Sequence, residues 1–150
     1  MVRYNRACMI PELQADGYLP PGVHEATEAE ATFRFGTETP RRRRLVLRLR
    51  RWIELARSCK ARRFLVDGSF ITAKLEPNDI DAVVLLSPDF FSAVEGGASA
   101  AIELEHMLVS RHPEELFAAE DEMDWNDWVE FFSRTREADG RRKGLVEVVL

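Results

Sequence analysis

Cysteine, histidine and long apolar runs are all scarce in this sequence. Its two cysteines, Cys8 and Cys59, cannot form a disulfide framework, and Cys59 falls on the apolar side of an expected helix, which indicates a buried free thiol. No stretch approaches the ~18 consecutive apolar residues of a membrane span, and the N-terminal segment lacks the apolar core of a secretory leader. We therefore expect a cytoplasmic protein without membrane contact.

The histidines form no catalytic or metal-binding pattern. His106 and His112 lack the spacing of metal ligands, and no Ser-His-Asp or Cys-His-Asp order stands out. The sequence thus gives no support for a hydrolase with a serine or cysteine nucleophile.

The length and composition are those of one globular domain. The chain has 150 residues, of which 45% are hydrophobic and 31% charged, which is enough for one core but not for two. Residues 16–22 are dense in turn formers, including Pro20 and Pro21, so they should form neither a helix nor a central strand. We predict an extended N-terminal arm over residues 1–24 and a single domain over residues 25–150.

Charge is unevenly distributed along the chain. The net charge of −5 argues against DNA as a partner. Residues 41–63 nevertheless contain eleven Lys or Arg and one acid, whereas residues 95–130 contain eleven acids and one base. Arg41, Arg44 and Arg48 share one face of an expected helix. This stripe suits RNA phosphates, an acidic partner, the acidic half of the same chain, or a solvated surface.

Helical and strand patterns alternate along the domain. Capping signals at Thr27 and at Thr39-Pro40, together with apolar spacings of three and four, predict helices over about residues 26–35, 40–60, 98–110 and 124–137. Short apolar runs predict strands over about residues 64–66, 80–86, 116–119 and 144–150. We therefore expect an α+β fold, an α/β sandwich whose mixed sheet of about four strands is flanked by helices.

The most informative stretch pairs Gly68-Ser69 with Asp79-x-Asp81, nine residues further on. Gly68 permits a close backbone approach, and Ser69 offers a hydroxyl and N–H groups to phosphate oxygens. Asp79 and Asp81 are two apart on an expected strand, so their carboxylates share one face and repel each other unless a cation lies between them. Mg²⁺ binds carboxylate and triphosphate oxygens together. The stretch predicts a nucleoside triphosphate site, although Gly68-Ser69 also suits a simple turn and Asp79 a turn cap.

With this spacing the chain resembles the DNA polymerase β-like nucleotidyltransferase superfamily, which includes the minimal nucleotidyltransferases of bacterial toxin–antitoxin pairs. From about residue 14 onward it is also similar to a functionally uncharacterised bacterial family within that fold. The segments that carry this similarity are Leu19-Pro20-Pro21-Gly22, Arg34-Phe35-Gly36, Asp67 to Lys74, Pro77 to Asp81, and Lys143-Gly144.

The resemblance implies a site in which three carboxylates hold two Mg²⁺ ions, with Mn²⁺ as a substitute. Asp79 and Asp81 would be the first two catalytic metal ligands, and Glu115, or alternatively Glu147, the third. The reaction would transfer a nucleoside monophosphate from an NTP to a protein or RNA acceptor and release pyrophosphate. Superfamily members usually have Asp at the third position, and Glu displaces the carboxylate by about one C–C bond.

The resemblance also assigns Gly68 and Ser69 to the binding of the triphosphate. Lys74, in the turn that follows, is a further nucleotide-binding candidate that could balance the triphosphate charge, although it also suits a solvated surface lysine. An unsuitable third ligand would instead leave a catalytically degenerate module that binds nucleotide or a partner, such as a toxin, within a toxin–antitoxin or phage-defence pair. The base and the acceptor remain open at this level.

Overall fold

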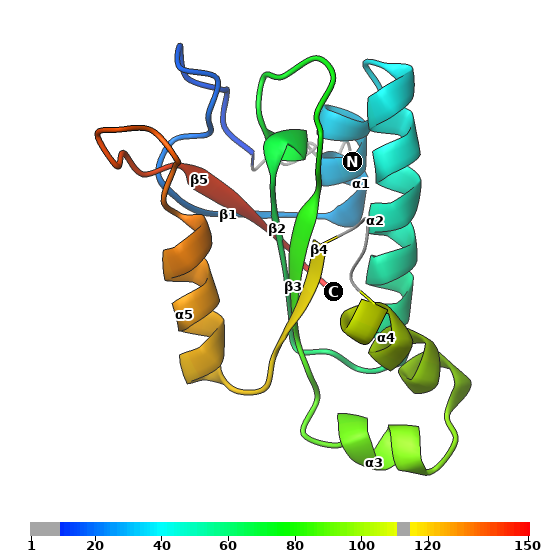
Figure 1. The fold of residues 1–150 in the computed structure, drawn as a ribbon. Helices are drawn as coiled ribbons and strands as arrows, with labels where there is room; N and C mark the ends of the chain where they lie inside the picture. The colour runs from blue at the N-terminus through cyan, green and yellow to red at the C-terminus, as the bar shows by residue number, and fades with distance from the viewer. Residues whose placement is uncertain (1–9, 111–114) are drawn as a thin grey trace, which may run out of the picture.

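The computed structural model describes residues 10–110 and 115–150. They form a five-stranded mixed sheet in the order β1-β5-β2-β3-β4 (Figure 1). β1 runs parallel to β5, and β3 parallel to β4, whereas β2 is antiparallel to both of its neighbours. The strands are β1 (Gly22–Ala26), β2 (Arg63–Asp67), β3 (Asp81–Leu85), β4 (Glu115–Ala119) and β5 (Gly144–Val148). The predicted α+β class is confirmed, with one strand more than expected.

Helices cover both faces of this sheet (Figure 1). α1, α2 and α4 pack on one face, and α5 packs on the other. The burial of the strand residues follows this division, because Phe64 and Val66 belong to one apolar cluster and Leu65 to the other. The helices are α1 (Glu28–Gly36), α2 (Pro40–Ser58), α3 (Phe90–Glu95), α4 (Ser99–Ser110) and α5 (Glu122–Phe132), with a short 3₁₀ turn, η1 (Ser69–Ile71).

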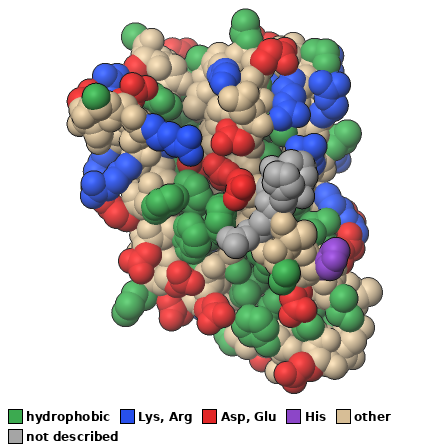
Figure 2. All heavy atoms as spheres, viewed as in Figure 1, with side chains coloured by type: hydrophobic (Ala, Val, Ile, Leu, Met, Phe, Trp, Pro, Cys, Tyr) green, Lys and Arg blue, Asp and Glu red, His purple; other side chains and the backbone are tan. Residues whose placement is uncertain are grey.

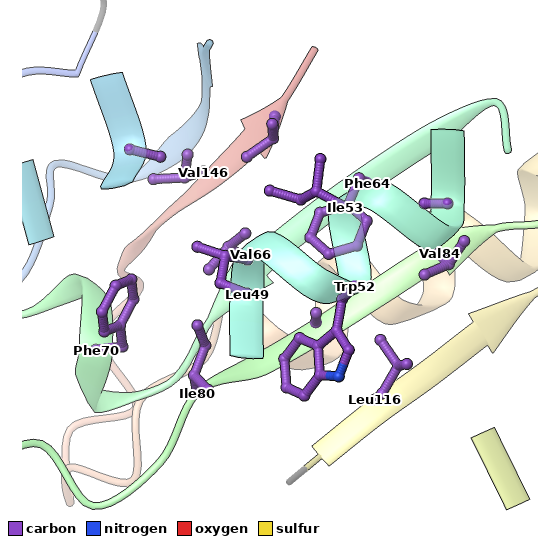
Figure 3. Packing of buried hydrophobic residues seen from close by; sticks show 14 of the residues in the cluster. Leu49, Trp52, Ile53, Phe64, Val66, Phe70, Ile80, Val84, Leu116 and Val146 are labelled. Carbon is purple, nitrogen blue, oxygen red and sulfur yellow. The ribbon is translucent and has the colours of Figure 1, made fainter. Parts of the chain in front are cut away.

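The long helix α2 begins where its capping signal predicts. The Thr39 side chain accepts a hydrogen bond from the Arg42 N–H, and Pro40 occupies the first turn. Its apolar stripe lies on the sheet, and Leu49, Trp52 and Ile53 point toward strand residues (Figure 3). Burying an aliphatic side chain of this size contributes about 1.5–3 kcal/mol. This packing fixes the position of α2 across the sheet.

Besides the short helix α3, which the sequence did not predict, two elements differ from the sequence prediction. Residues 22–24, placed in the extended arm, begin the edge strand β1, whose mostly exposed side chains give no apolar run. The helix expected to reach about residue 137 ends at Phe132, because the chain turns back in a hairpin in which the Lys143 N–H bonds to Ser133 O. This hairpin returns the chain to β5 and brings Lys143 to the end of β2.

Several arginines of the basic segment bind within the chain itself. Arg51 pairs with Glu103 of the acidic half, and Arg57 pairs with Glu28. Arg41 donates to the backbone carbonyls of residues 77 and 78. Attraction between the two halves of the chain is therefore confirmed for Arg51, while an RNA or protein partner for the stripe stays a prediction.

The structure also bears on the predictions for the cysteines and for a membrane span. Cys59 is a half-buried free thiol, and burial raises its pKa, whereas Cys8 and His112 lie outside the described residues. Among the described helices, not one combines the length and the apolar character that crossing a bilayer requires.

Candidate functional site

A cleft of about 790 Å³ opens where β2 ends and β3 begins. All of the predicted motif residues line it, and so does Lys143. The motif residues are Gly68, Ser69, Lys74, Asp79 and Asp81. In Figure 2, acidic side chains gather near the middle of the face seen in Figure 1, next to an apolar patch. The structure therefore brings the two halves of the motif together at one end of the sheet.

Gly68 is required by the path of the chain itself. Its φ of +91° lies in the region that favours glycine, and a Cβ would come within 3.0 Å of the Asp81 nitrogen and 3.1 Å of the Asp79 carbonyl oxygen. The close backbone approach that the sequence analysis assigned to a ligand is thus made by the segment leading into β3. This approach is what sets Ser69 beside Asp79.

Ser69 fixes the carboxylate of Asp79. The Ser69 hydroxyl donates to Asp79 Oδ1 at 2.6 Å, and the Ser69 N–H donates to the same oxygen at 2.9 Å. Burial acts to raise the pKa of Asp79, but these hydrogen bonds and nearby positive charge lower it below its ordinary value. Asp79 is therefore held ionised in one orientation, and the Ser69 groups predicted to face phosphate are turned toward Asp79.

Asp81 belongs to a row of acids that crosses three strands. As the first residue of β3 it is paired in register with Asp67 of β2 and with Glu115 of β4. Within residues 10–110 and 115–150 the Asp81 side chain makes no hydrogen bond or ion pair. Burial, reinforced by the charges of Asp79, Asp67 and Glu115, raises the pKa of Asp81 to about 7. A half-buried carboxylate among other acids is a chemical environment that suits a divalent cation.

Lys143 supplies positive charge beside this row. Its ammonium lies 2.8 Å from Asp67 Oδ1, and Asp67 is only 3% exposed. Burial raises the pKa of Asp67 despite the attraction of Lys143. The sequence analysis quoted Lys143 only as part of a motif and gave it no role. The available signal was its position directly before β5, the strand that pairs with β2.

The two candidates for the third carboxylate lie in different environments. Glu115 is next to Asp81 in register, close enough for its charge to act on that residue. Glu147 instead uses both carboxylate oxygens to bind Arg63, at 2.6 and 2.9 Å. Neither residue is among those lining the cleft. Over the described part of the chain, no three His, Cys, Asp or Glu side chains are gathered as a metal-binding group. The site is thus built on a pair, Asp79 and Asp81.

The row of acids makes the free energy of unfolding depend on pH. The Asp81 pKa of about 7 exceeds its ordinary value of 3.8, so the folded chain holds an extra proton between these values. The stability due to protonated Asp81 is complete below its unfolded-state pKa and is lost as the pH rises through about 7. Asp81→Asn lacks this titrating proton. We therefore expect its free energy of unfolding, relative to that of the wild type, to rise by about 1–2 kcal/mol from pH ~5 to pH ~8, after allowance for solvent screening. Urea denaturation at both pH values measures this gain, and parallel pH profiles would contradict it.

Comparison with known proteins shows the family to which the chain belongs. No curated protein and no solved structure matches the chain significantly. A family model described as "Family of unknown function (DUF6932)" matches residues 11–149. The description of this family assigns no activity, so the resemblance to nucleotidyltransferases stays a prediction. The matched region includes every residue of the cleft, and the chain belongs to the DUF6932 family.

Proposed function

We propose that the cleft binds a nucleoside triphosphate together with a divalent cation, and that the protein transfers the nucleoside monophosphate to a protein or RNA acceptor. The observation that carries this proposal is the pair formed by Asp79, held ionised by Ser69, and Asp81, half-buried and without a hydrogen-bond or ion-pair partner among the described residues. Two such carboxylates at the mouth of one cleft lack only a cation to balance them.

The residues around the pair suit a polyphosphate. Asp79 and Asp81, which both line the cleft, would hold Mg²⁺ or Mn²⁺. Glu115, the register partner of Asp81 on β4, is the candidate for a third ligand, although it lies outside the cleft lining. When bound, the cation supplies charge neutralisation for the phosphate oxygens and activation of the attacking hydroxyl. Lys74 is exposed at the edge of the cleft, where its ammonium is available to phosphate oxygens. Lys143 stays with Asp67 and limits the repulsion among the acids.

Binding is tested first, by thermal unfolding with ATP, GTP, CTP or UTP. In the presence of Mg²⁺, a nucleotide at 100 times its dissociation constant should stabilise the fold by about 2.7 kcal/mol, which corresponds to a rise in Tm of roughly 5–10 °C. The same nucleotide with EDTA should give a much smaller rise, because the two carboxylates then repel the phosphates. If no nucleotide raises the Tm with Mg²⁺ present, the proposal is wrong.

A second function, nucleotide binding without transfer, has a specific observation in its favour. The third position carries Glu rather than Asp, and in the described residues it is not gathered with Asp79 and Asp81 into a metal-binding group. Such a protein would serve as a nucleotide- or partner-binding module, for example beside a toxin. Mg²⁺-dependent nucleotide binding without any label transferred to the protein, to RNA or to a neighbour-encoded protein would favour this function.

A further inference from the structure

An aromatic and a cationic side chain line the cleft in addition to its acids. Phe131, in the last turn of α5, lines the same cleft as Asp79 and Asp81, and so does Arg136 from the hairpin that follows. Neither residue belongs to the Gly-Ser or Asp-x-Asp motif, and neither has a role in the chemistry proposed above. Both side chains are therefore placed to contact a ligand bound in the cleft.

Phe131 is exposed although its aromatic neighbours are packed. It is 65% exposed, whereas Phe132 is 8% exposed and belongs to the core between α5 and the sheet. Its ring meets Trp128 and Phe132 edge to face, at interplanar angles of 90° and 80°. Within the described residues it has no stacked partner. The ring thus packs against two aromatic neighbours while much of its surface remains open to solvent.

Arg136 differs from the other arginines of the hairpin. Arg134 and Arg142 both bind Glu130, and Arg141 binds Asp139. Arg136 is exposed and, as far as the described residues extend, forms no ion pair, but its charge acts favourably on Asp79. A guanidinium at the edge of the cleft, close enough to influence a carboxylate of the pair, is placed to bind an anion held beside that pair.

We propose that Phe131 is the stacking platform for the nucleobase and that Arg136 binds the phosphate chain between the base and the carboxylate pair. This inference rests on the proposed function and extends it to the substrate class, a nucleotide whose base is bound by stacking. Because every base has a π face, stacking tolerates all four nucleotides, and the larger purine rings gain most. The cleft should therefore rank ATP and GTP above CTP and UTP.

The test separates the base from the phosphates. Isothermal titration calorimetry in Mg²⁺ compares ATP with inorganic tripolyphosphate, which has no base. Phe131→Ala should weaken ATP binding about tenfold, within the range measured for loss of one stacking contact, and leave tripolyphosphate binding unchanged. Phe131→Tyr should restore ATP binding, because it keeps the ring. Arg136→Gln should weaken both ligands.

An exposed phenylalanine outside the cleft provides the matched control. Phe91 of α3 is 51% exposed, meets Phe90 edge to face and lies outside the cleft, so Phe91→Ala should change neither affinity. If Phe131→Ala alters ATP affinity less than twofold, or weakens tripolyphosphate equally, the stacking inference is overturned while the proposed function stands. If the wild type binds neither ligand in Mg²⁺, both are overturned.

Discussion

Simultaneous replacement of Asp79 and Asp81 by alanine should abolish transfer of nucleoside monophosphate, lowering the rate by more than about 1,000-fold. The physical reason is that, as far as the described residues show, these are the two acids of the cleft lining that form no ion pair with a lysine or arginine. The measurement is the radioactivity transferred from NTPs labelled at the α-phosphate to the protein, to RNA or to a neighbour-encoded protein. Label retained by the double variant would refute the assignment of both carboxylates.

Stability provides the control for this loss. Removing Asp81 relieves repulsion among the acids, and this offsets the loss of the hydrogen bonds that Asp79 accepts from Ser69, so the double variant should stay folded with a Tm close to that of the wild type at pH ~8. Glu147→Gln gives the opposite combination, since it breaks the contact with Arg63 and leaves the cleft intact. It should lower stability and keep transfer. An inactive variant that is as stable as the wild type would identify the pair as functional rather than structural acids.

The sequence predicted the elements whose signals are local and strong. α2 follows from Thr39-Pro40 and a long apolar period, and β2 and β3 follow from apolar runs that are buried on both faces. β1 was missed because an edge strand needs no apolar run, and α3 because six residues are too few to show a helical period. Strong periodic patterns are thus reliable, whereas short or exposed elements depend on tertiary contacts.

The candidate site shows the same division. Gly68, Ser69, Asp79 and Asp81 were found as a group because their spacing along the chain is itself the signal. The exposure of Phe131 was also implicit, because the apolar stripe of α5 runs through Trp125, Trp128 and Phe132 and leaves the neighbouring ring outside it. The pairing of Lys143 with Asp67 was not predictable, since it joins residues far apart in sequence through the return of the hairpin.

Arg42 is the clearest feature that the sequence concealed. It lies within four consecutive arginines that look equivalent, yet its side chain is only 3% exposed, whereas Arg43 and Arg44 are exposed. One guanidinium nitrogen donates to the carbonyl oxygens of Phe35, at 3.0 Å, and Phe70, and the other donates to those of Thr72, at 2.7 Å, and Lys74. A single side chain thus ties α1 to the loop that forms one side of the cleft.

Replacing Arg42 with methionine should therefore destabilise the fold by about 3 kcal/mol or more, because carbonyl groups buried around the guanidinium lose their donors. Arg44→Met, two residues along the same helix but exposed, is the matched control and should change stability by less than about 0.5 kcal/mol. Urea denaturation followed by tryptophan fluorescence gives both values. Equal effects of the two substitutions would show that the bonds made by Arg42 do not hold the loop.

The consequence for the site follows from where those carbonyls lie. Phe70, Thr72 and Lys74 belong to the segment between Ser69 and Asp79, so a loop released from Arg42 loses the geometry that presents both motifs to one cleft. Arg42→Lys retains the positive charge, but a single ammonium has three donors and cannot bridge four carbonyls in the way that a planar guanidinium does. It should remain folded at low temperature yet bind Mg²⁺ and ATP at least about tenfold more weakly than the wild type. Nucleotide affinity equal to that of the wild type in folded Arg42→Lys would mean that the loop keeps its shape without this clamp.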